Sequence, residues 1–574
     1  MSGARTQPEH IAQDPRAFRV SGRLHGTIVA AVAVWLAGVG TIAALGAAPR
    51  GQATAPGAGR GPIVNIAADG LVGCLVPPLA IDGSHGRDEL LTAYRKLVDH
   101  YADAGVPYLF LNVCYQRAAY PSKVWDTYWD LDDPDTQATG WPRCYWLLHK
   151  KGVDPFAACI ARCRARGVSP WLSIRMNDTH YIDDPTRISS FWQRHPELRR
   201  APQGGYDFTH QAVRDHYLAL VAEVMDRYDC DGVELDWMRF PWHFKPGEER
   251  RGRAALDDFM RAAHELAEQA SRRRGHVVRL AARIPAVPEF AQGLGMDGVA
   301  WARNGWVDML ILASVWRPSD TDIPIERWRA LLGPAAGNVL LAAGTDLWLQ
   351  GAPGGKLMSD DRETQRAFTA AMLDRGADLI YLFNHFNMND FRYQEPLPDG
   401  RTVVRDEGSA LLAEAGRLEA AVQGARRHVL TFHDPAPPGL PNPKPLPAQL
   451  ALGRPVRFRL FIGPKPTKGR VILRVGLERA PGVAEARLGA RLNGAACGPL
   501  EDLTGPAPRK PNPHDASRVF HVAHVAHRMV QFEAPLGAAR RGYNEVALRL
   551  VHGAPQKVVW LEIYLTFETR RQAS

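Results

Sequence analysis

Two acidic residues share one short hydrophobic segment of the chain. Glu234 and Asp236 stand two positions apart among valine, leucine and tryptophan, a composition that predicts a β-strand. Side chains two apart lie on the same face of a strand, so both carboxylates face one way and Trp237 faces the other. Two buried carboxylates are costly unless they are paired, protonated or used in catalysis, and shared burial drives their pKa values apart. We predict a catalytic acid/base role for both; a structural ion pair with Arg239 or Arg175 is the alternative.

Polar side chains also gather at the ends of other predicted strands. Their hydroxyl, amide, carboxylate, guanidinium and imidazole groups suit hydrogen bonding to a polar ligand, and a tryptophan adds a stacking face. The candidate binding residues are Tyr115, Arg117, Arg175, Asn177, Asp178, His180, Arg239, Trp316, Asp346, Asn384 and His385. Among them, Arg175, Asn177 and Asp178 form the densest group.

These residues need a frame that brings strand ends together. Between residues 62 and 425, short β-branched segments alternate with longer amphipathic ones, which is typical of repeated βα units. The predicted strands cover residues 63–67, 108–115, 168–176, 232–238, 277–284, 307–315, 339–345 and 379–384. Eight such units predict a (β/α)8 TIM barrel, whose active site lies at the carboxyl ends of the strands. A doubly wound open sheet is the alternative, but no GxGxxG turn follows the first strand.

The sequence changes in character after Arg427. A proline-dense stretch over residues 435–447 precedes short alternating segments at 456–461, 471–475, 543–550 and 558–567. Alternation interrupted by turns is typical of antiparallel sheets, and Asn493-Gly494 has the composition of a tight hairpin turn. We predict a C-terminal all-β domain, sandwich-like, over residues 428–570.

The first 50 residues differ from the rest. Residues 27–48 carry no charged side chain and follow a stretch that contains four arginines. This pattern is typical of a signal peptide or a membrane anchor, and the small residues near its end favour cleavage. We therefore expect the remainder to be exported and to be periplasmic, at the cell surface or secreted, with residues 27–48 as its only membrane contact.

The overall composition is that of a folded globular protein. The chain has 574 residues, of which 45% are hydrophobic and 23% charged. Its formal charge of +9 comes from 70 basic and 61 acidic residues spread along the whole length, so we expect no nucleic-acid groove. Seven cysteines are too few for a disulfide scaffold of this size.

A longer pattern surrounds the acidic strand. It runs over residues 209–241 and includes Val213-Arg214, Leu218, Val221, Tyr228, Asp231-Gly232, Asp236, Arg239 and Pro241. This stretch resembles the glycosyl hydrolase-like 10 group of (β/α)8 barrels, and the resemblance implies a carbohydrate-active hydrolase with Asp236 at its site. Chitinase-like barrels have a DxxDxDxE pattern on strand four, and this chain has Met238 where their catalytic glutamate stands. In α-amylase-like barrels a strand-four DGxxxD ends in the nucleophile, a position that again falls on Asp236.

Glycoside hydrolysis needs a second carboxyl group, about 5 Å away for retention and roughly 6.5–9.5 Å away for inversion. The candidates are Glu289, Asp346 and Glu234. Glu289 follows the predicted fifth strand in a loop stiffened by two prolines, so we expect it to be the general acid. An exposed loop carboxylate without a catalytic role is the alternative.

The sequence thus predicts an exported glycoside hydrolase-like protein that cleaves glycosidic bonds in a polysaccharide or glycoconjugate. The alternative is a non-catalytic carbohydrate-binding or scaffold protein that retains the barrel. We expect no cofactor and no metal, because the three histidines at 521, 524 and 527 need a helix that their surroundings do not favour. No GxSxG or Walker motif is present.

Overall fold

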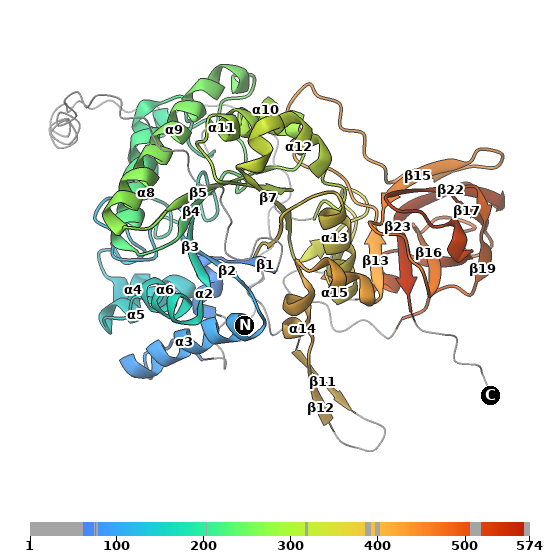
Figure 1. The fold of residues 1–574 in the computed structure, drawn as a ribbon, viewed down its shortest axis with the longest axis horizontal. Helices are drawn as coiled ribbons and strands as arrows, with labels where there is room; N and C mark the ends of the chain where they lie inside the picture. Colours follow the sequence, from blue (N-terminus) through green and yellow to red (C-terminus); the bar gives the residue numbers. More distant parts are fainter. Residues whose placement is uncertain are drawn as a thin grey trace, which may run out of the picture. The chain divides into compact units, whose positions relative to one another are not determined.

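Eight parallel strands close into a barrel (Figure 1). The computed structural model describes residues 61–73, 75, 79–201, 204–315, 319–384, 392–396, 402–505, 518–519 and 521–567. In chain order around the ring, the strands are β1 (Pro62–Ile66), β2 (Tyr108–Cys114), β3 (Ser169–Arg175), β4 (Gly232–Asp236), β5 (Arg279–Pro285), β6 (Met309–Ala313), β7 (Leu340–Thr345) and β10 (Leu379–Leu382). The last strand pairs with the first, which closes the ring. The predicted (β/α)8 barrel is confirmed.

The inside of the barrel changes from hydrophobic to charged along the strands. Near the amino ends, buried side chains such as Ile63, Trp171 and Met309 fill the interior. Gly232 is required there, because a Cβ at this position would lie 2.4 Å from the Trp171 ring. At the carboxyl ends the inward-facing residues are charged, which places them where barrel enzymes carry their chemistry.

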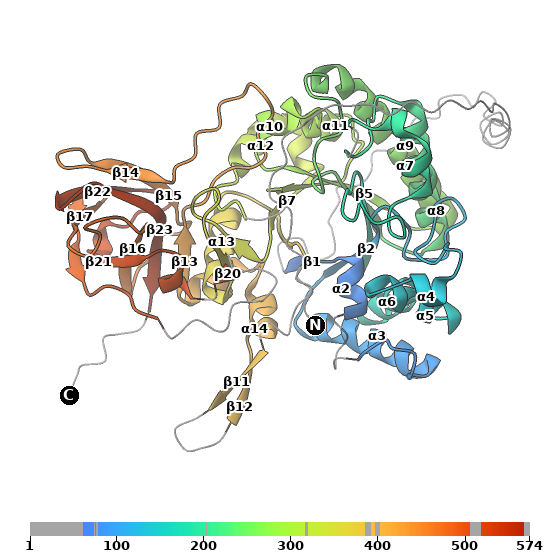
Figure 2. The same cartoon turned by 180° about the vertical axis from the view of Figure 1, so that it is seen from behind.

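Helices surround the barrel (Figure 2). They are α2 (Ala68–Gly73), α3 (Arg87–Asp103), α4 (Pro134–Gln137), α5 (Trp141–Lys150), α6 (Pro155–Arg166), α7 (Ser190–Arg194), α8 (Gln211–Arg227), α9 (Glu249–Arg274), α10 (Pro288–Gly293), α11 (Gly298–Arg303), α12 (Ile325–Leu332), α13 (Arg362–Asp374), α14 (Glu407–Glu414) and α15 (Leu418–Gln423). Helix α6 begins after Asp154, whose side chain accepts a hydrogen bond from the Ala157 N–H. It ends at Gly167 in a left-handed conformation.

Two antiparallel sheets follow the barrel and pack face to face. One contains β13 (Arg426–Val429), β14 (Ala448–Leu450), β16 (Arg470–Leu477), β19 (Gly498–Leu500), β21 (Arg528–Ala534) and β23 (Gln556–Thr566). The other contains β15 (Val456–Phe461), β17 (Arg487–Leu492), β18 (Ala495–Ala496) and β22 (Tyr543–His552). A shared core with Leu473, Leu548 and Ile563 lies between them, which confirms the sandwich-like domain. Asn493 and Gly494 form the expected turn, both with positive φ.

Three small strands and a hairpin complete the fold. Strands β8 (Trp348–Leu349), β9 (Leu357–Ser359) and β20 (Arg518–Val519) form one sheet, and β11 (Arg392–Pro396) pairs with β12 (Thr402–Asp406). Figure 1 shows this hairpin leading into α14.

Buried arginines join the barrel to the sandwich. On β13, Arg427 donates to Glu562 of β23 at 2.9 Å and to Asp361, the N-cap of α13, at 2.6 Å. Arg375, at the end of α13, donates to the Tyr543 hydroxyl of β22 at 2.6 Å. Residues 54–574 form one compact unit. The all-β part is therefore packed firmly against the last helices of the barrel.

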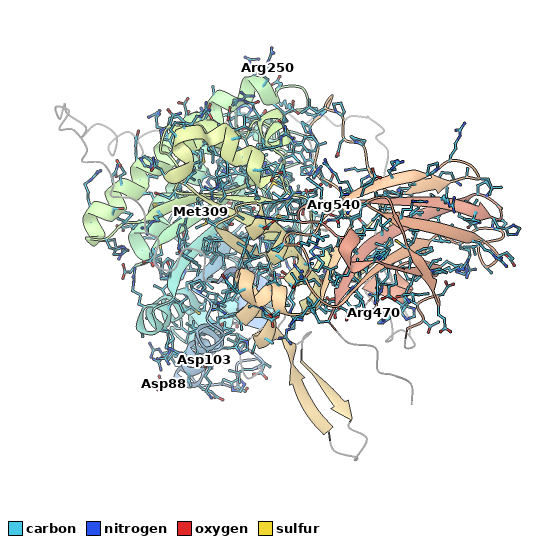
Figure 3. The ribbon with its side chains drawn as sticks, turned by 45° about the vertical axis from the view of Figure 1, so that its right-hand side comes forward. Asp88, Asp103, Arg250, Met309, Arg470 and Arg540 are labelled. Carbon is cyan, nitrogen blue, oxygen red and sulfur yellow. The ribbon has the colours of Figure 1, made fainter. Side chains whose placement is uncertain are left out.

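Charged side chains cover the outside of the molecule (Figure 3). Asp88 on α3 is almost fully exposed, whereas Met309 on β6 is buried inside the barrel. Within the described ranges, no helix combines the length and hydrophobicity that a membrane crossing requires. Residues 27–48, the predicted signal or anchor, lie outside the described residues. Cys159 and Cys163 are buried side chains of α6 that form no disulfide.

Candidate active site

A row of three charges crosses the carboxyl end of the barrel. Arg175 on β3, Asp236 on β4 and Arg283 on β5 occupy the same register, so their side chains share the inner face. Arg283 Nη1 lies 3.0 Å from Asp236 Oδ1, and both side chains are buried. The direct ion-pair partner of Asp236 is thus Arg283, and neither Arg239 nor Arg175 takes that place.

One oxygen of Asp236 is fixed and the other is not. Oδ1 accepts hydrogen bonds from Arg283 and from the Met238 N–H, which lies 3.0 Å away. Oδ2 is buried and has no hydrogen-bond partner within the described part of the chain. Buried acceptor atoms nearly always have a hydrogen-bond partner, so a buried carboxylate oxygen without one is unusual. It leaves Asp236 with a strong acceptor that a ligand hydroxyl or a developing positive charge can use.

Glu234 lies one layer deeper on the same strand. Its carboxylate accepts a hydrogen bond from the Tyr381 hydroxyl at 2.6 Å and a longer one from the Asn65 amide at 3.4 Å. Burial and the nearby charge of Asp236 raise the pKa of Glu234 to about 7. Near neutral pH, Glu234 therefore holds a proton part of the time, while Asp236 is in an ion pair with Arg283. A carboxyl group that holds a proton near neutral pH can act as a general acid.

A second chain of contacts leads from the barrel interior to the surface. Arg175 donates to Asp178 at 3.1 Å, and the other Asp178 oxygen contacts His180 Nδ1 at 2.7 Å. His180 Nε2 faces the Arg239 guanidinium at 3.2 Å. Burial opposes the negative charge on Asp178. The electrostatic attraction of His180, Arg175 and Arg239 outweighs burial and lowers the pKa of Asp178 to about 2. Burial and the charge of Arg175 lower the pKa of Arg239 to about 10.

Arg117 and Asn177, two of the predicted binding residues, form hydrogen bonds to the backbone of the protein itself. The Arg117 guanidinium donates to the carbonyls of Ile188 at 3.0 Å and of Thr127 at 3.1 Å. The Asn177 amide donates to the Tyr206 carbonyl at 3.0 Å and accepts from its N–H at 2.8 Å. Because these groups hold neighbouring loops together, the geometry favours a structural role for both residues.

Tyr115 and Asp346 lie close to the charged row. Tyr115 donates to Asp69 at 2.6 Å, and its ring lies under Arg175 at 4.0 Å. Asp346 follows β7, and its charge helps raise the pKa of Arg283. Asn384 follows β10 in a left-handed conformation with φ of 53°. Trp316 and His385 lie outside the described residues.

Glu289 is not part of this group. It lies on α10, its side chain is 46% exposed, and it forms an ion pair with Arg327 of α12. Among the described residues, no hydrogen bond or ion pair joins Glu289 to Asp236 or Glu234. The geometry supports the alternative of an exposed carboxylate, here at the start of a helix, and Glu234 remains as the candidate acid on which the charge of Asp236 acts.

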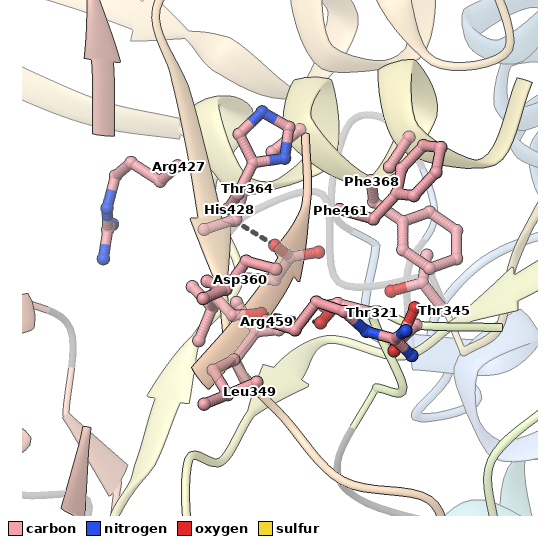
Figure 4. A pocket seen from close by; sticks show the side chains of 16 residues that line it. Thr321, Thr345, Leu349, Asp360, Thr364, Phe368, Arg427, His428, Arg459 and Phe461 are labelled. Carbon is pink, nitrogen blue, oxygen red and sulfur yellow. Dashed lines mark hydrogen bonds between the residues drawn. The ribbon is translucent and has the colours of Figure 1, made fainter. Parts of the chain in front are cut away.

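Two cavities lie elsewhere. One, of about 20 Å³, lies between α13, β13 and β15, where Asp360 and Thr364 are hydrogen-bonded to each other (Figure 4). This volume holds about one water molecule, so it excludes a sugar. The other, of about 540 Å³, is lined by Glu289 and its neighbours on α10, α11 and α12. Neither cavity is lined by Asp236 or Glu234.

Two residues of the site escaped the sequence analysis. Arg283 pairs with Asp236, and its ring neighbour is Phe383, over which the guanidinium lies at 3.7 Å. Tyr381 donates to Glu234. The signal for both was a polar group within a hydrophobic stretch of a strand, Arg283 among residues 280–285 and Tyr381 in β10.

Comparisons with known proteins reach only distant structures. No family model and no curated protein matches the chain. One match is an α-amylase from Geobacillus thermoleovorans complexed with acarbose, with 10% sequence identity and a TM-score of 0.34. The aligned region covers 86% of this chain and 99% of the amylase chain. Another match is a putative α-L-fucosidase from Bacteroides thetaiotaomicron, with 11% sequence identity and a TM-score of 0.31. The aligned region covers 88% of this chain and 95% of the fucosidase chain.

A cycloisomaltooligosaccharide glucanotransferase from Paenibacillus sp. matches with 9% identity, 88% of this chain and a TM-score of 0.32. This chain spans 57% of the length of that protein. At these identities and TM-scores, function must be inferred from the site itself. The resemblance to the glycosyl hydrolase-like 10 group stays a prediction.

Proposed function

We propose that the barrel is a glycoside hydrolase in which Asp236 faces the sugar and Glu234 supplies the proton. The observation that carries this proposal is the buried Asp236 Oδ2, which has no hydrogen-bond partner within the described residues. Arg283 and the Met238 N–H hold the other oxygen, so the carboxylate is oriented before substrate arrives. Such preorganised charge is most effective where positive charge develops in the transition state.

The reaction divides between the two carboxyl groups. Glu234, with a pKa of about 7, gives its proton to the glycosidic oxygen as the bond from that oxygen to the anomeric carbon breaks. Asp236 stabilises the positive charge on the sugar ring or attacks the anomeric carbon. In retention, Asp236 forms the covalent intermediate, water then displaces it, and the proton of that water returns to Glu234. In inversion, water adds directly to the anomeric carbon and Asp236 takes its proton, so the anomer released distinguishes the two.

Two observations favour the second candidate, a carbohydrate-binding protein without catalysis. Met238 stands where chitinase-like barrels have their catalytic glutamate, and Asp236 is 0% exposed. A protein of this kind needs hydrogen-bonding groups and aromatic rings at the barrel mouth, without turnover. Binding with no product on any glycan would favour this candidate.

The direct test is a glycan panel with product analysis. The full-length protein should release sugars from at least one glycan, and Asp258→Asn, an exposed control on α9, should do the same. Glu234→Gln should lose most activity on that glycan but keep much more on a 2,4-dinitrophenyl glycoside of the same sugar, whose leaving group needs no proton. An equal loss on both substrates would remove Glu234 as the general acid.

We also propose that the protein acts outside the cytoplasm, which rests on residues 27–48 alone. Mass measurement of the mature protein should show a chain shortened by the leader. A full-length chain in the membrane fraction would favour an anchor, and a full-length chain in the cytoplasm would contradict export.

A further inference from the structure

Aromatic side chains form a rim beside the charged network. Tyr181 belongs to the loop after β3, and Trp141 begins α5. The Trp141 indole N–H donates to the Tyr181 hydroxyl at 3.3 Å, and their ring centroids lie 6.2 Å apart. The ring centroid of Tyr115, which follows β2, lies 6.4 Å from that of Tyr181. The rim thus lies at the carboxyl ends of two adjacent barrel strands.

The backbone is strained where this rim is built. Tyr181 and Phe240, in the loops after β3 and β4, both have positive φ, at 61° and 59°. For a bulky aromatic residue, this conformation is a true outlier, and it persists only where the surroundings enforce it. Such residues cluster at ligand-binding and catalytic sites. Both rings lie beside the His180 imidazole, with centroid separations of 6.1 Å for Tyr181 and 4.9 Å for Phe240.

The Tyr181 ring is held by Arg187 and remains partly exposed. The Arg187 guanidinium lies over the ring at 4.5 Å and is itself held by Asp184 at 3.2 Å. The interplanar angles between Tyr181 and the rings of Tyr115, Trp141 and His180 are 90°, 48° and 45°. None of these described rings therefore stacks flat on Tyr181. Tyr181 is 37% exposed. A tyrosine that is fixed by its neighbours and partly exposed is preorganised for stacking, which limits the entropy lost on binding.

His180 connects this rim to the buried charges of Asp178 and Arg239. Its imidazole touches Tyr181 on one side and the buried Asp178 and Arg239 on the other. The His180 side chain is 20% exposed, whereas those of Arg175, Asp178 and Asp236 are buried. The network of charges therefore comes closest to solvent beside Tyr181.

From these contacts we propose that Tyr181, supported by Trp141 and Arg187, is a stacking subsite for a sugar ring adjacent to the one held at Asp236. This inference rests on the proposed function. A pyranose presents a face of C–H groups that can stack on an aromatic ring such as that of Tyr181. The occupant is thus an oligosaccharide of at least two units, and a monosaccharide does not reach the rim.

The test measures binding without turnover. In the full-length Asp236→Asn variant, maltohexaose, cellohexaose, xylohexaose, chitohexaose and hexagalacturonate are titrated by calorimetry, together with the corresponding monosaccharides. Adding Tyr181→Ala should weaken binding of the best oligosaccharide about tenfold, the scale of one lost aromatic contact. Tyr181→Phe, which keeps the ring, should restore most of the affinity. Trp146→Ala, on the same helix as Trp141 but outside the rim, should leave the affinity unchanged.

The outcomes separate the two proposals. If an oligosaccharide binds and Tyr181→Ala weakens binding as stated, with unchanged circular dichroism and melting temperature, the subsite is supported. If an oligosaccharide binds equally well to Tyr181→Ala, the subsite is overturned and the proposed function stands. If none of the five binds and the wild-type protein cleaves none, the proposed function fails and the subsite fails with it.

Discussion

Asp236 and Arg283 form a buried pair in which each charge depends on the other. Both side chains lie inside the barrel, and their 3.0 Å contact is the direct compensation for the carboxylate. Removing one member of a buried pair leaves an uncompensated charge, which is much more costly than losing an exposed salt bridge. The same pair that orients Asp236 for chemistry is therefore also a point of structural weakness.

Arg283→Met should lower the free energy of unfolding by about 3–5 kcal/mol, because it leaves Asp236 buried without its partner. Urea denaturation measures this change. Arg272→Met is the matched control, since Arg272 is largely exposed on α9 and its nearest carboxylate oxygen is 3.9 Å away. A change below about 1 kcal/mol for Arg283→Met would show that the pair adds nothing to stability.

Glu234 should set the alkaline limb of the pH–rate profile. A general acid must be protonated, and the raised pKa of Glu234 is about 7. The value of kcat/KM should therefore fall as pH rises through about 7, by about tenfold per pH unit above it. In Glu234→Gln, the residual activity should lose this limb. An alkaline limb that persists in the variant would assign it to another group.

At the scale of elements, the segment between β13 and β14 packs against α10, where the ring centroids of His433 and Phe290 lie 6.4 Å apart. His433 in this segment contacts Asp320, in the loop after β6, at 2.6 Å between Nδ1 and Oδ2. The charge of Asp320 outweighs burial and raises the pKa of His433 to about 8; Asp322 adds to this effect and Lys444 opposes it. The contact fastens the proline-dense segment to the barrel.

This contact should make stability depend on pH. The folded pKa of His433 lies above the unfolded value of about 6.5, so its stabilising effect is complete below pH 6.5 and is lost as pH rises through 8. His433→Gln should remove about 1 kcal/mol of stability at pH 6 and almost none at pH 9, a value reduced for partial solvent screening. Equal losses at both pH values, by urea denaturation, would contradict the assignment.

At the scale of the whole molecule, the sandwich is built into the barrel through buried charge. Glu562 on β23 is fully buried and accepts from Arg427 of β13 and Arg474 of β16, each at 2.9 Å. Burial opposes its charge, but the two arginines outweigh burial and lower the pKa of Glu562 to about 2. Because Arg427 also binds the N-cap of α13, the network spans both parts of the fold.

Glu562→Gln should therefore destabilise the whole chain by about 3–5 kcal/mol, because two buried guanidinium groups lose their shared carboxylate. Calorimetry should show the barrel and the sandwich unfolding together in one transition, shifted to lower temperature. Glu478→Gln, an exposed residue paired with Lys557 in the same sheet, is the control. A separate early transition for the sandwich alone would mean that the network does not couple the two parts.

The fold could be predicted from the sequence because hydrophobic periodicity is local. Every predicted barrel strand overlaps an observed one, and the carboxyl ends of adjacent strands then bring Arg175, Asp178 and Asp236 together. The partners of each charge could not be predicted in the same way. Glu289 turns to Arg327 because α10 begins at Pro288, and Asp236 meets Arg283 only through a register that closing the barrel determines.

The rate of hydrolysis by Asp236→Asn tests the central claim most directly. On a glycan that the wild-type protein cleaves, the nearly isosteric change should lower kcat/KM by about a thousandfold or more, while the melting temperature shows that the protein remains folded. Turnover within about twofold of the wild type, on the same glycan, would remove Asp236 from the mechanism and with it the enzyme proposed here.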